Sequence, residues 1–164
     1  MAYVIKFYTD AGCKGNGTSG AIGAAAAVFE TEDGDYKSWK MSLASYPTPT
    51  NERAGIEAIV LALEKALDLF DNLNSSPWLD VAIYSDSRYG VDCMTKWIYK
   101  WTRNGWVNYA GHDVANRDLL EQASDLDQRL RAEGDVQFLW IPREKNGIAD
   151  RLCNEAMDEQ DCYY

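Results

Sequence analysis

The segment WLDVAIYSD, residues 78–86, decides the fold of this chain. It is an apolar run that is short and β-branched enough to be a buried parallel strand. An aspartate, Asp86, stands at its end. Ligands of open α/β sheets bind beyond the carboxyl ends of the strands, so Asp86 is a candidate functional residue.

Two more aspartates occupy comparable positions. Asp10 follows the strand-forming run YVIKFYT at 3–9, and Asp150 follows the run VQFLWIP at 136–142 after a short charged segment. Carboxylates at the ends of neighbouring strands converge, and they repel one another unless a cation neutralises them. Together the three aspartates predict a divalent-metal site, although any one of them alone is at least as often a turn or cap residue.

The remaining segments predict a mixed sheet. Three strands joined by short turns form an antiparallel meander, and YPTPTN at 46–51 then breaks the chain and offers Thr50 or Asn51 as a helix cap. Strands are expected at 3–9, 21–30, 36–44, 78–85 and 136–142, and helices at 52–70, after Ser87, through the tryptophan-rich segment, over 114–134 with Gly134 as C-cap, and at 146–160. This order predicts an α/β fold whose five-stranded sheet, antiparallel and then parallel, is flanked by helices.

Size and cysteine usage restrict the class of protein. The 164 residues, 46% of them hydrophobic, predict a single domain spanning 1–164 with its own core. No apolar stretch at the start suits a signal peptide or a membrane span, so we expect a soluble cytoplasmic monomer with no membrane partner. We expect free thiols, and neither a zinc site nor a disulfide framework, from the four scattered cysteines, which are Cys13, Cys93, Cys153 and Cys162.

The charge of the chain is acidic overall but uneven. A net charge of −10 argues against a polyanionic partner, yet the segment 94–112, MTKWIYKWTRNGWVNYAGH, has three basic and no acidic side chains and holds three of the six tryptophans. Basic and aromatic side chains in alternation suit contact with a nucleic acid. Alternatively, Trp97 and Trp101 form a packed helix stripe with lysines on its solvated face. The only histidine is His112, so proton transfer must depend on water, metal or carboxylates.

Five blocks of sequence carry a family resemblance. They are YTDAGCKGNG (8–17), TNERAGIEAIVLALE (50–64), YSDSRYGVDCMTKWIYKWTRNGW (84–106), ANRDLLEQ (115–122) and WIPREKNGIADRLCNEA (140–156). In order and spacing they resemble the type 1 ribonucleases H, and the segment 94–112 resembles the basic handle of that family. The resemblance implies an RNase H-like fold and endonucleolytic hydrolysis of the RNA strand of RNA–DNA hybrids, leaving 5′-phosphomonoesters.

The resemblance also assigns roles to single residues. It implies two Mg²⁺ or Mn²⁺ ions, with Asp10 bridging both, Asp86 on the ion that activates water and Asp150 on the ion near the leaving group. The implied substrate contacts are Cys13, Asn16, Asn51 and Ser87 in the minor groove of the hybrid, Thr50 and Arg53 in a pocket for a DNA phosphate, and Trp97 where the handle meets the DNA. Each of the small polar residues could instead serve only in a turn or a helix cap.

The sequence departs from the family pattern at position 55. The family has a glutamate there that completes the metal cluster, and this chain has Gly55. Glu57 cannot replace it, because residues two apart on a helix point about 200° apart, whereas Glu52 lies on nearly the same face and is the better substitute. We hypothesise that the missing ligand weakens metal binding and slows hydrolysis without unfolding the protein.

A second departure lies in the segment 142–149, which lacks the histidine that many family members use there for proton transfer or product release. Arg143, Glu144 and Lys145 could contact phosphate or water instead, or form an ordinary charged loop. Two alternatives to a hybrid-cleaving enzyme therefore remain. One is a non-catalytic module that binds RNA–DNA hybrids, and the other is a nuclease of the same superfamily that acts on DNA.

Overall fold

The protein forms one five-stranded mixed sheet. The computed structural model describes residues 2–31 and 33–161, so Cys162 lies outside the described residues. The strands are β1 (Ala2–Lys14), β2 (Ile22–Glu30), β3 (Tyr36–Ser42), β4 (Trp78–Ser85) and β5 (Gly134–Trp140), in the order β3-β2-β1-β4-β5. β1, β2 and β3 pair antiparallel, and β4 lies parallel to both β1 and β5. The predicted mixed sheet is confirmed.

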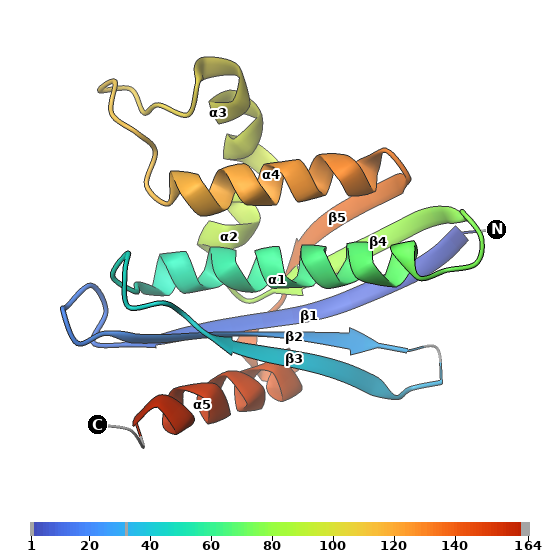
Figure 1. The fold of residues 1–164 in the computed structure, drawn as a ribbon, viewed down its shortest axis with the longest axis horizontal. Coiled ribbons are helices and arrows are strands. Elements are labelled where there is room, and N and C mark those ends of the chain that lie inside the picture. The colour runs from blue at the N-terminus through green and yellow to red at the C-terminus, as the bar shows by residue number, and fades with distance from the viewer. Residues whose placement is uncertain (1, 32, 162–164) are drawn as a thin grey trace.

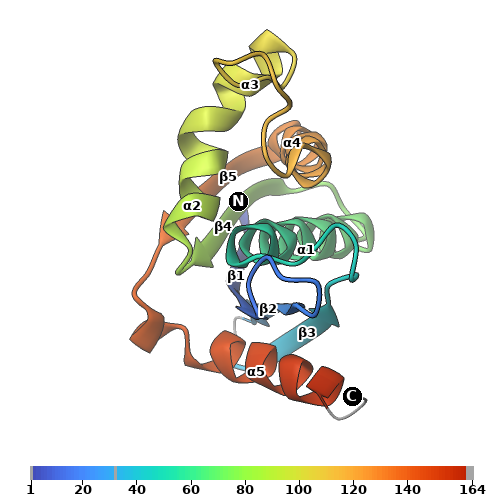
Figure 2. The same cartoon turned by 90° about the vertical axis from the view of Figure 1, so that its left-hand side faces the viewer.

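Helices cover both faces of the sheet (Figures 1 and 2). On one face lie α1 (Asn51–Asp71) and α4 (Arg117–Arg131), and on the other lies α5 (Gly147–Asp161), which packs over β1, β2 and β3. Three consecutive helical pieces form one column, which comprises α2 (Arg88–Asp92), the π-helical turn η1 (Cys93–Trp97) and α3 (Ile98–Asn104). The column begins at α2 beside α1 and the sheet, and its α3 end projects beyond α4. A short 3-10 turn, η2 (Arg143–Lys145), connects β5 to α5.

The core lies between the sheet and α1. Ile5 and Phe7 in β1 are fully buried, whereas Lys6 between them is exposed, as the two-residue period of a strand requires. The ring of Phe7 lies 5.5 Å from that of Phe29 and 6.0 Å from that of Trp39. α1 contributes its predicted apolar face, which comprises Ile56, Ile59, Val60, Leu63 and Leu67.

Two predicted boundaries were wrong. Ala11, Gly12 and Cys13, expected in a turn, continue β1, because the small residues of β2 allow the ladder to extend to the pair Lys14 and Ile22. Gly134, expected as the C-cap of the preceding helix, is the first residue of β5, and Ala132 caps α4 instead. A β-carbon at Gly134 would lie 2.1 Å from the carbonyl oxygen of Leu79, so only glycine allows this approach of β5 to β4.

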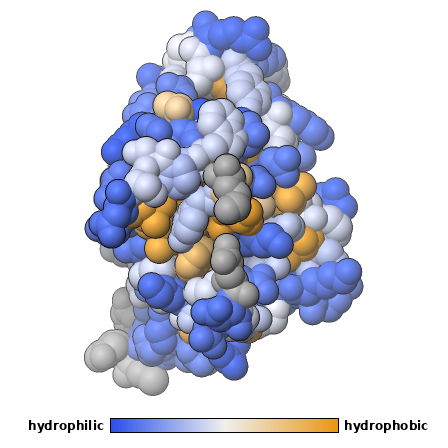
Figure 3. All heavy atoms as spheres, turned by 90° about the vertical axis from the view of Figure 1, so that its right-hand side faces the viewer, coloured by the Kyte–Doolittle hydropathy of each residue, from blue (hydrophilic) through white to orange (hydrophobic). Residues whose placement is uncertain are grey.

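The end of the molecule where β1 and β4 begin has a mostly hydrophilic surface with a smaller apolar patch (Figure 3). Val4 and Trp78, at the starts of these two strands, are exposed large hydrophobic residues. Among the described residues, no helix has the length and apolarity needed to span a membrane. The predicted free thiols are found at Cys13, Cys93 and Cys153.

Candidate active site

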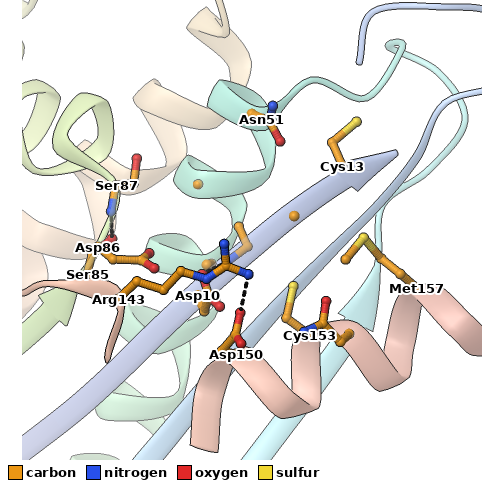
Figure 4. Close-up of a pocket in the computed structure, with 15 residues that line it drawn as sticks. Asp10, Cys13, Asn51, Ser85, Asp86, Ser87, Arg143, Asp150, Cys153 and Met157 are labelled. Carbon is orange, nitrogen blue, oxygen red and sulfur yellow. Dashed lines mark hydrogen bonds and ion pairs between the residues drawn. The ribbon is translucent and has the colours of Figure 1, made fainter. Parts of the chain in front are cut away.

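The three predicted aspartates face one cavity. It has a volume of about 420 Å³ and lies at the carboxyl ends of β1 and β4. Its walls come from β1, the start of α1, the turn after β4, η2 and α5 (Figure 4). The lining residues used below are Asp10, Cys13, Asn51, Gly55, Asp86, Ser87, Arg143 and Asp150.

Strand pairing places Asp10 beside Asp86. Thr9 and Ser85 are the last partners in the parallel ladder of β1 and β4, so the residue that follows each of them lies where this ladder ends. Asp10 itself is still within β1, which continues to Lys14 beside β2. Asp150 arrives from a different element, in the first turn of α5. The buried Asn146 fixes that turn, because its Nδ2 donates to the carbonyl oxygen of Thr9 at 2.7 Å.

The side chain of Trp140 supports the backbone at Asp86. Its Nε1 donates to the carbonyl oxygen of Asp86 at 3.1 Å, and the guanidinium of Arg88 lies 3.9 Å from the centroid of its ring. The sequence analysis did not single out Trp140. No signal in the sequence could have found it, because the contact depends on how β5 ends relative to β4.

The electrostatics of the cavity are unfavourable for three charged carboxylates. Asp10 is only 6% exposed. Burial, and next the negative charge of Asp86, raise the pKa of Asp10 to about 8, with Asp150 also raising it and the amide of Ala11 opposing the shift. A cation in the cavity would relieve this repulsion.

Arg143 supplies one positive charge to the cavity. Its Nη2 donates to Oδ1 of Asp150 at 3.2 Å, and its side chain remains 73% exposed. The charge of Asp150 raises the pKa of Arg143 first, and the charges of Asp10 and Asp86 add to the shift. The sequence analysis offered Arg143 only as one of three loop residues that could contact phosphate.

The three carboxylates are chemically suitable ligands for a hard divalent cation, but they do not lie close enough together to hold one. Asp10, Asp86 and Asp150 offer only carboxylate oxygens, the ligands that Mg²⁺ and Mn²⁺ prefer. Within residues 2–31 and 33–161, however, no three His, Cys, Asp or Glu side chains lie close enough together to hold an ion as they stand. Any ion that binds must therefore draw these carboxylates closer.

Gly55, at the position where the resemblance implies a glutamate, lies in the wall of this cavity. A β-carbon on Gly55 would lie 2.9 Å from Oγ of Ser87, which accepts a hydrogen bond from the amide of Gly90 and caps α2. Neither Glu52 nor Glu57 is among the described lining residues. Glu52, the predicted substitute for the missing carboxylate, lines a different cavity, beside the handle.

The predicted substrate-contacting residues divide into two groups. Cys13, Asn51 and Ser87 line the cavity, whereas Asn16, Thr50, Arg53 and Trp97 do not. Oδ1 of Asn16 accepts from the amide of Asn51 at 2.7 Å, and Oγ1 of Thr50 accepts from the amide of Arg53 at 3.0 Å as the N-cap of α1. Both small polar residues therefore have the turn or cap role that was the alternative interpretation.

Arg53 is largely buried and is held by Asp118. Its Nη1 and Nη2 donate to the two carboxylate oxygens of Asp118 at 2.9 and 2.7 Å. These hydrogen bonds lower the pKa of Asp118 and raise that of Arg53. Nη1 of Arg53 also lies 3.5 Å from Oδ1 of Asn116, so the guanidinium, Asn116 and Thr50 mark one small polar area at the start of α1.

Replacing Thr50 by alanine is expected to lower the free energy of unfolding by about 1 kcal/mol, the usual cost of removing an N-cap oxygen. Thr50→Ser keeps the oxygen and is the matched control. Urea denaturation of both variants measures the difference. A loss of the same size in Thr50→Ser would contradict a capping role.

The handle, residues 94–112, carries a row of three indoles whose rings are tilted relative to one another. The rings of Trp97 and Trp101 lie 5.9 Å apart, and those of Trp101 and Trp106 lie 6.4 Å apart. Trp97 is 40% exposed and lines a second cavity of about 340 Å³ together with Glu52, Tyr89, Lys100 and Trp101. The three indoles thus pack in a row within the handle, and Trp97 remains partly exposed in the same cavity as Lys100.

Comparison with known proteins gives a consistent result. A family model described as RNase H matches residues 3–159. A Clostridium botulinum protein named ribonuclease H is 32% identical over 160 residues, covering 94% of this chain and 96% of its own length. A Haemophilus influenzae protein named ribonuclease HI is 30% identical over 156 residues, covering 94% and 88%. A foamy viral protease–reverse transcriptase solved with an RNA/DNA hybrid matches 94% of this chain and 20% of that chain, with a TM-score of 0.75 and 20% identity.

Proposed function

The chain belongs to the RNase H family, and on that premise we propose that it is an endonuclease that hydrolyses the RNA strand of RNA–DNA hybrids with divalent metal ions. The observation that carries the proposal is the single cavity shared by Asp10, Asp86 and Asp150 at the carboxyl ends of β1 and β4. Residues 1–164 form one RNase H domain in this proposal, with residues 94–112 as its handle.

The three aspartates are the proposed ligands of two Mg²⁺ or Mn²⁺ ions. When bound, the two ions supply activation of the attacking water and stabilisation of the leaving 3′ oxygen, which leaves the 5′-phosphate on the product. Asp10 is the most buried of the three, and it interacts electrostatically with both Asp86 and Asp150. It is therefore the proposed ligand shared by the two ions. This chemistry needs no histidine at the site.

Substrate recognition is proposed to involve two areas. Cys13, Asn51 and Ser87 border the carboxylates and would contact the minor groove, where the 2′-hydroxyl distinguishes RNA from DNA. Trp97 and Lys100, in the second cavity, would contact the sugar and phosphate of the DNA strand. The remaining substrate contacts of the proposal are Asn16 in the first turn and Thr50 and Arg53 at a DNA phosphate.

The missing carboxylate at Gly55 is proposed to slow hydrolysis. No glutamate among the described residues takes its place in the cavity wall. Gly55 also favours a second candidate function, that of a module that binds RNA–DNA hybrids without cleaving them.

Restoring the carboxylate with Gly55→Glu is expected to raise the Mg²⁺-dependent rate of hybrid cleavage about tenfold or more, within the range that tuning of metal ligands produces. Gly55→Ala is the matched control, because it adds only the β-carbon that presses on Ser87. We expect Gly55→Ala to cleave no faster than the unchanged chain. A folded Gly55→Glu protein that cleaves at the rate of the unchanged chain would contradict the hypothesis that the missing carboxylate slows hydrolysis.

One assay separates the candidate functions. A labelled RNA–DNA hybrid, an RNA duplex and a DNA duplex are each incubated with the protein in Mg²⁺, in Mn²⁺ and in chelator. Cleavage of the RNA strand of the hybrid alone, and only with metal, supports the ribonuclease. Hybrid binding without cleavage at saturating Mn²⁺ supports the binding module, and cleavage of duplex DNA alone would establish a different nuclease.

A further inference from the structure

Arg143 is a positively charged residue in a cavity that is otherwise lined by acidic charged groups. It lies on η2, a turn of three residues, and reaches into a cavity whose other charged lining groups are Asp10, Asp86 and Asp150 (Figure 4). Among the described residues, its guanidinium donates one side-chain hydrogen bond, to Oδ1 of Asp150, and its side chain is otherwise exposed. A guanidinium held at one end by a single ion pair can leave without disturbing the fold.

Building on the proposed function, we propose that Arg143 is an internal counter-ion of the aspartate cluster that competes with divalent metal for Asp150. In the metal-free protein the guanidinium holds Asp150 and neutralises part of the cluster. Metal binding requires Asp150 to release Arg143. The pair therefore stabilises the metal-free state and weakens metal binding by the same interaction.

Three observations support this competition. Asp150 is paired with Arg143 while no three acidic side chains of the described segments are arranged to hold an ion. The charged side chains that line the cavity are three carboxylates and one guanidinium, so Arg143 offsets one of three negative charges. The side chain of Arg143 is 73% exposed, so solvent can accept it when it leaves.

Lys145 provides a matched control on the same turn. It lies two residues from Arg143 but lines a different cavity, with Tyr8, Glu30 and Tyr36. Arg143→Gln and Lys145→Gln remove the same charge from the same short helix. Only Arg143→Gln removes a charge from the cavity that the three aspartates line.

The experiment measures metal binding in the absence of nucleic acid. Mn²⁺ is titrated calorimetrically into the unchanged chain, Arg143→Gln, Lys145→Gln and Asp150→Asn, each with and without Asp10→Asn, and the melting temperature of each is recorded in chelator. We expect Arg143→Gln to bind Mn²⁺ about tenfold more tightly, a typical coupling between two competing ligands, and to melt lower in chelator. Lys145→Gln should change neither quantity appreciably.

The double variant Arg143→Gln/Asp150→Asn completes the design. If Arg143 acts through Asp150, its removal changes Mn²⁺ affinity little once Asp150 is already neutral. Equal Mn²⁺ affinities for Arg143→Gln and Lys145→Gln, with binding that still depends on Asp10, would overturn the competition but leave the metal site intact. Absence of Asp10-dependent Mn²⁺ binding in every variant, Arg143→Gln included, would overturn the proposed metal-dependent function and the competition with it.

Discussion

Asp10→Asn is expected to reduce metal-dependent cleavage of an RNA–DNA hybrid about a thousandfold while leaving the protein folded. Asn keeps the shape of the side chain but removes the negative charge from the most buried carboxylate of the cavity. Single-turnover cleavage with excess enzyme measures the effect without a contribution from product release. Asp80→Asn, at an exposed position near the start of β4, is the matched control and should cleave normally.

The same variant has an expected signature in stability. In chelator, folded Asp10 keeps its proton up to its raised pKa of about 8, whereas the unfolded chain releases it near 3.8. The free energy of unfolding therefore falls as pH rises between these two values. Burial of Asp10 is the main cause of this loss, the charge of Asp86 and the contact with Asp150 add to it, and the amide of Ala11 opposes it.

Asp10→Asn lacks this titration, so we expect it to be more stable than the unchanged chain by a few kcal/mol at pH 8 and by little at pH 4. Thermal unfolding in chelator at the two pH values measures the difference. A variant that loses activity and also loses stability at pH 8 would show that Asp10 is needed for folding rather than for binding a cation.

Phe7→Ala is expected to lower the free energy of unfolding by about 4 kcal/mol, within the range for truncating a buried phenylalanine. Phe7 is fully buried, and its ring packs against Phe29 and Trp39 at the centre of the sheet, so the loss leaves a cavity between β1 and α1. Denaturant titration followed by far-ultraviolet circular dichroism measures the change.

Lys6→Ala is the control for this substitution. Lys6 is the neighbour of Phe7 on the same strand but faces solvent, so its truncation should change stability by less than about 0.5 kcal/mol. Similar losses for Phe7→Ala and Lys6→Ala would contradict the assignment of the two faces of β1.

Sequence periodicity was enough to predict most of the fold. The alternation of Ile5, Lys6 and Phe7 and the helical spacing of Ile56, Ile59 and Leu63 report burial directly, because side-chain direction repeats every two or 3.6 residues. The convergence of Asp10 and Asp86 also followed from sequence, since it needs only that β1 and β4 be parallel neighbours. Strand pairing confirmed that condition.

Contacts between side chains that are far apart in the chain could not be predicted from the sequence. Nothing local distinguishes Arg143 from the other charges of its loop, because its pairing with Asp150 depends on the path of η2. Gly134 was taken for a helix cap, since a glycine that lets two strands approach and a glycine that ends a helix look alike in sequence. Glu52 shares the helical angle of position 55 but lines a different cavity, because that angle does not say how far along α1 a residue lies.

The loop between β5 and α5 is held at both ends. The amide of Ile141 donates to the carbonyl oxygen of Ser85 at 2.9 Å, and Nδ2 of Asn146 donates to that of Thr9 at 2.7 Å. Both anchors are main-chain acceptors in the two central strands, and neither depends on the identity of residues 142–145. Residues 142–145 are therefore a suitable segment for loop exchange in protein engineering. Loops of other lengths, including one that carries histidine, can be grafted between fixed anchors directly above the carboxylates.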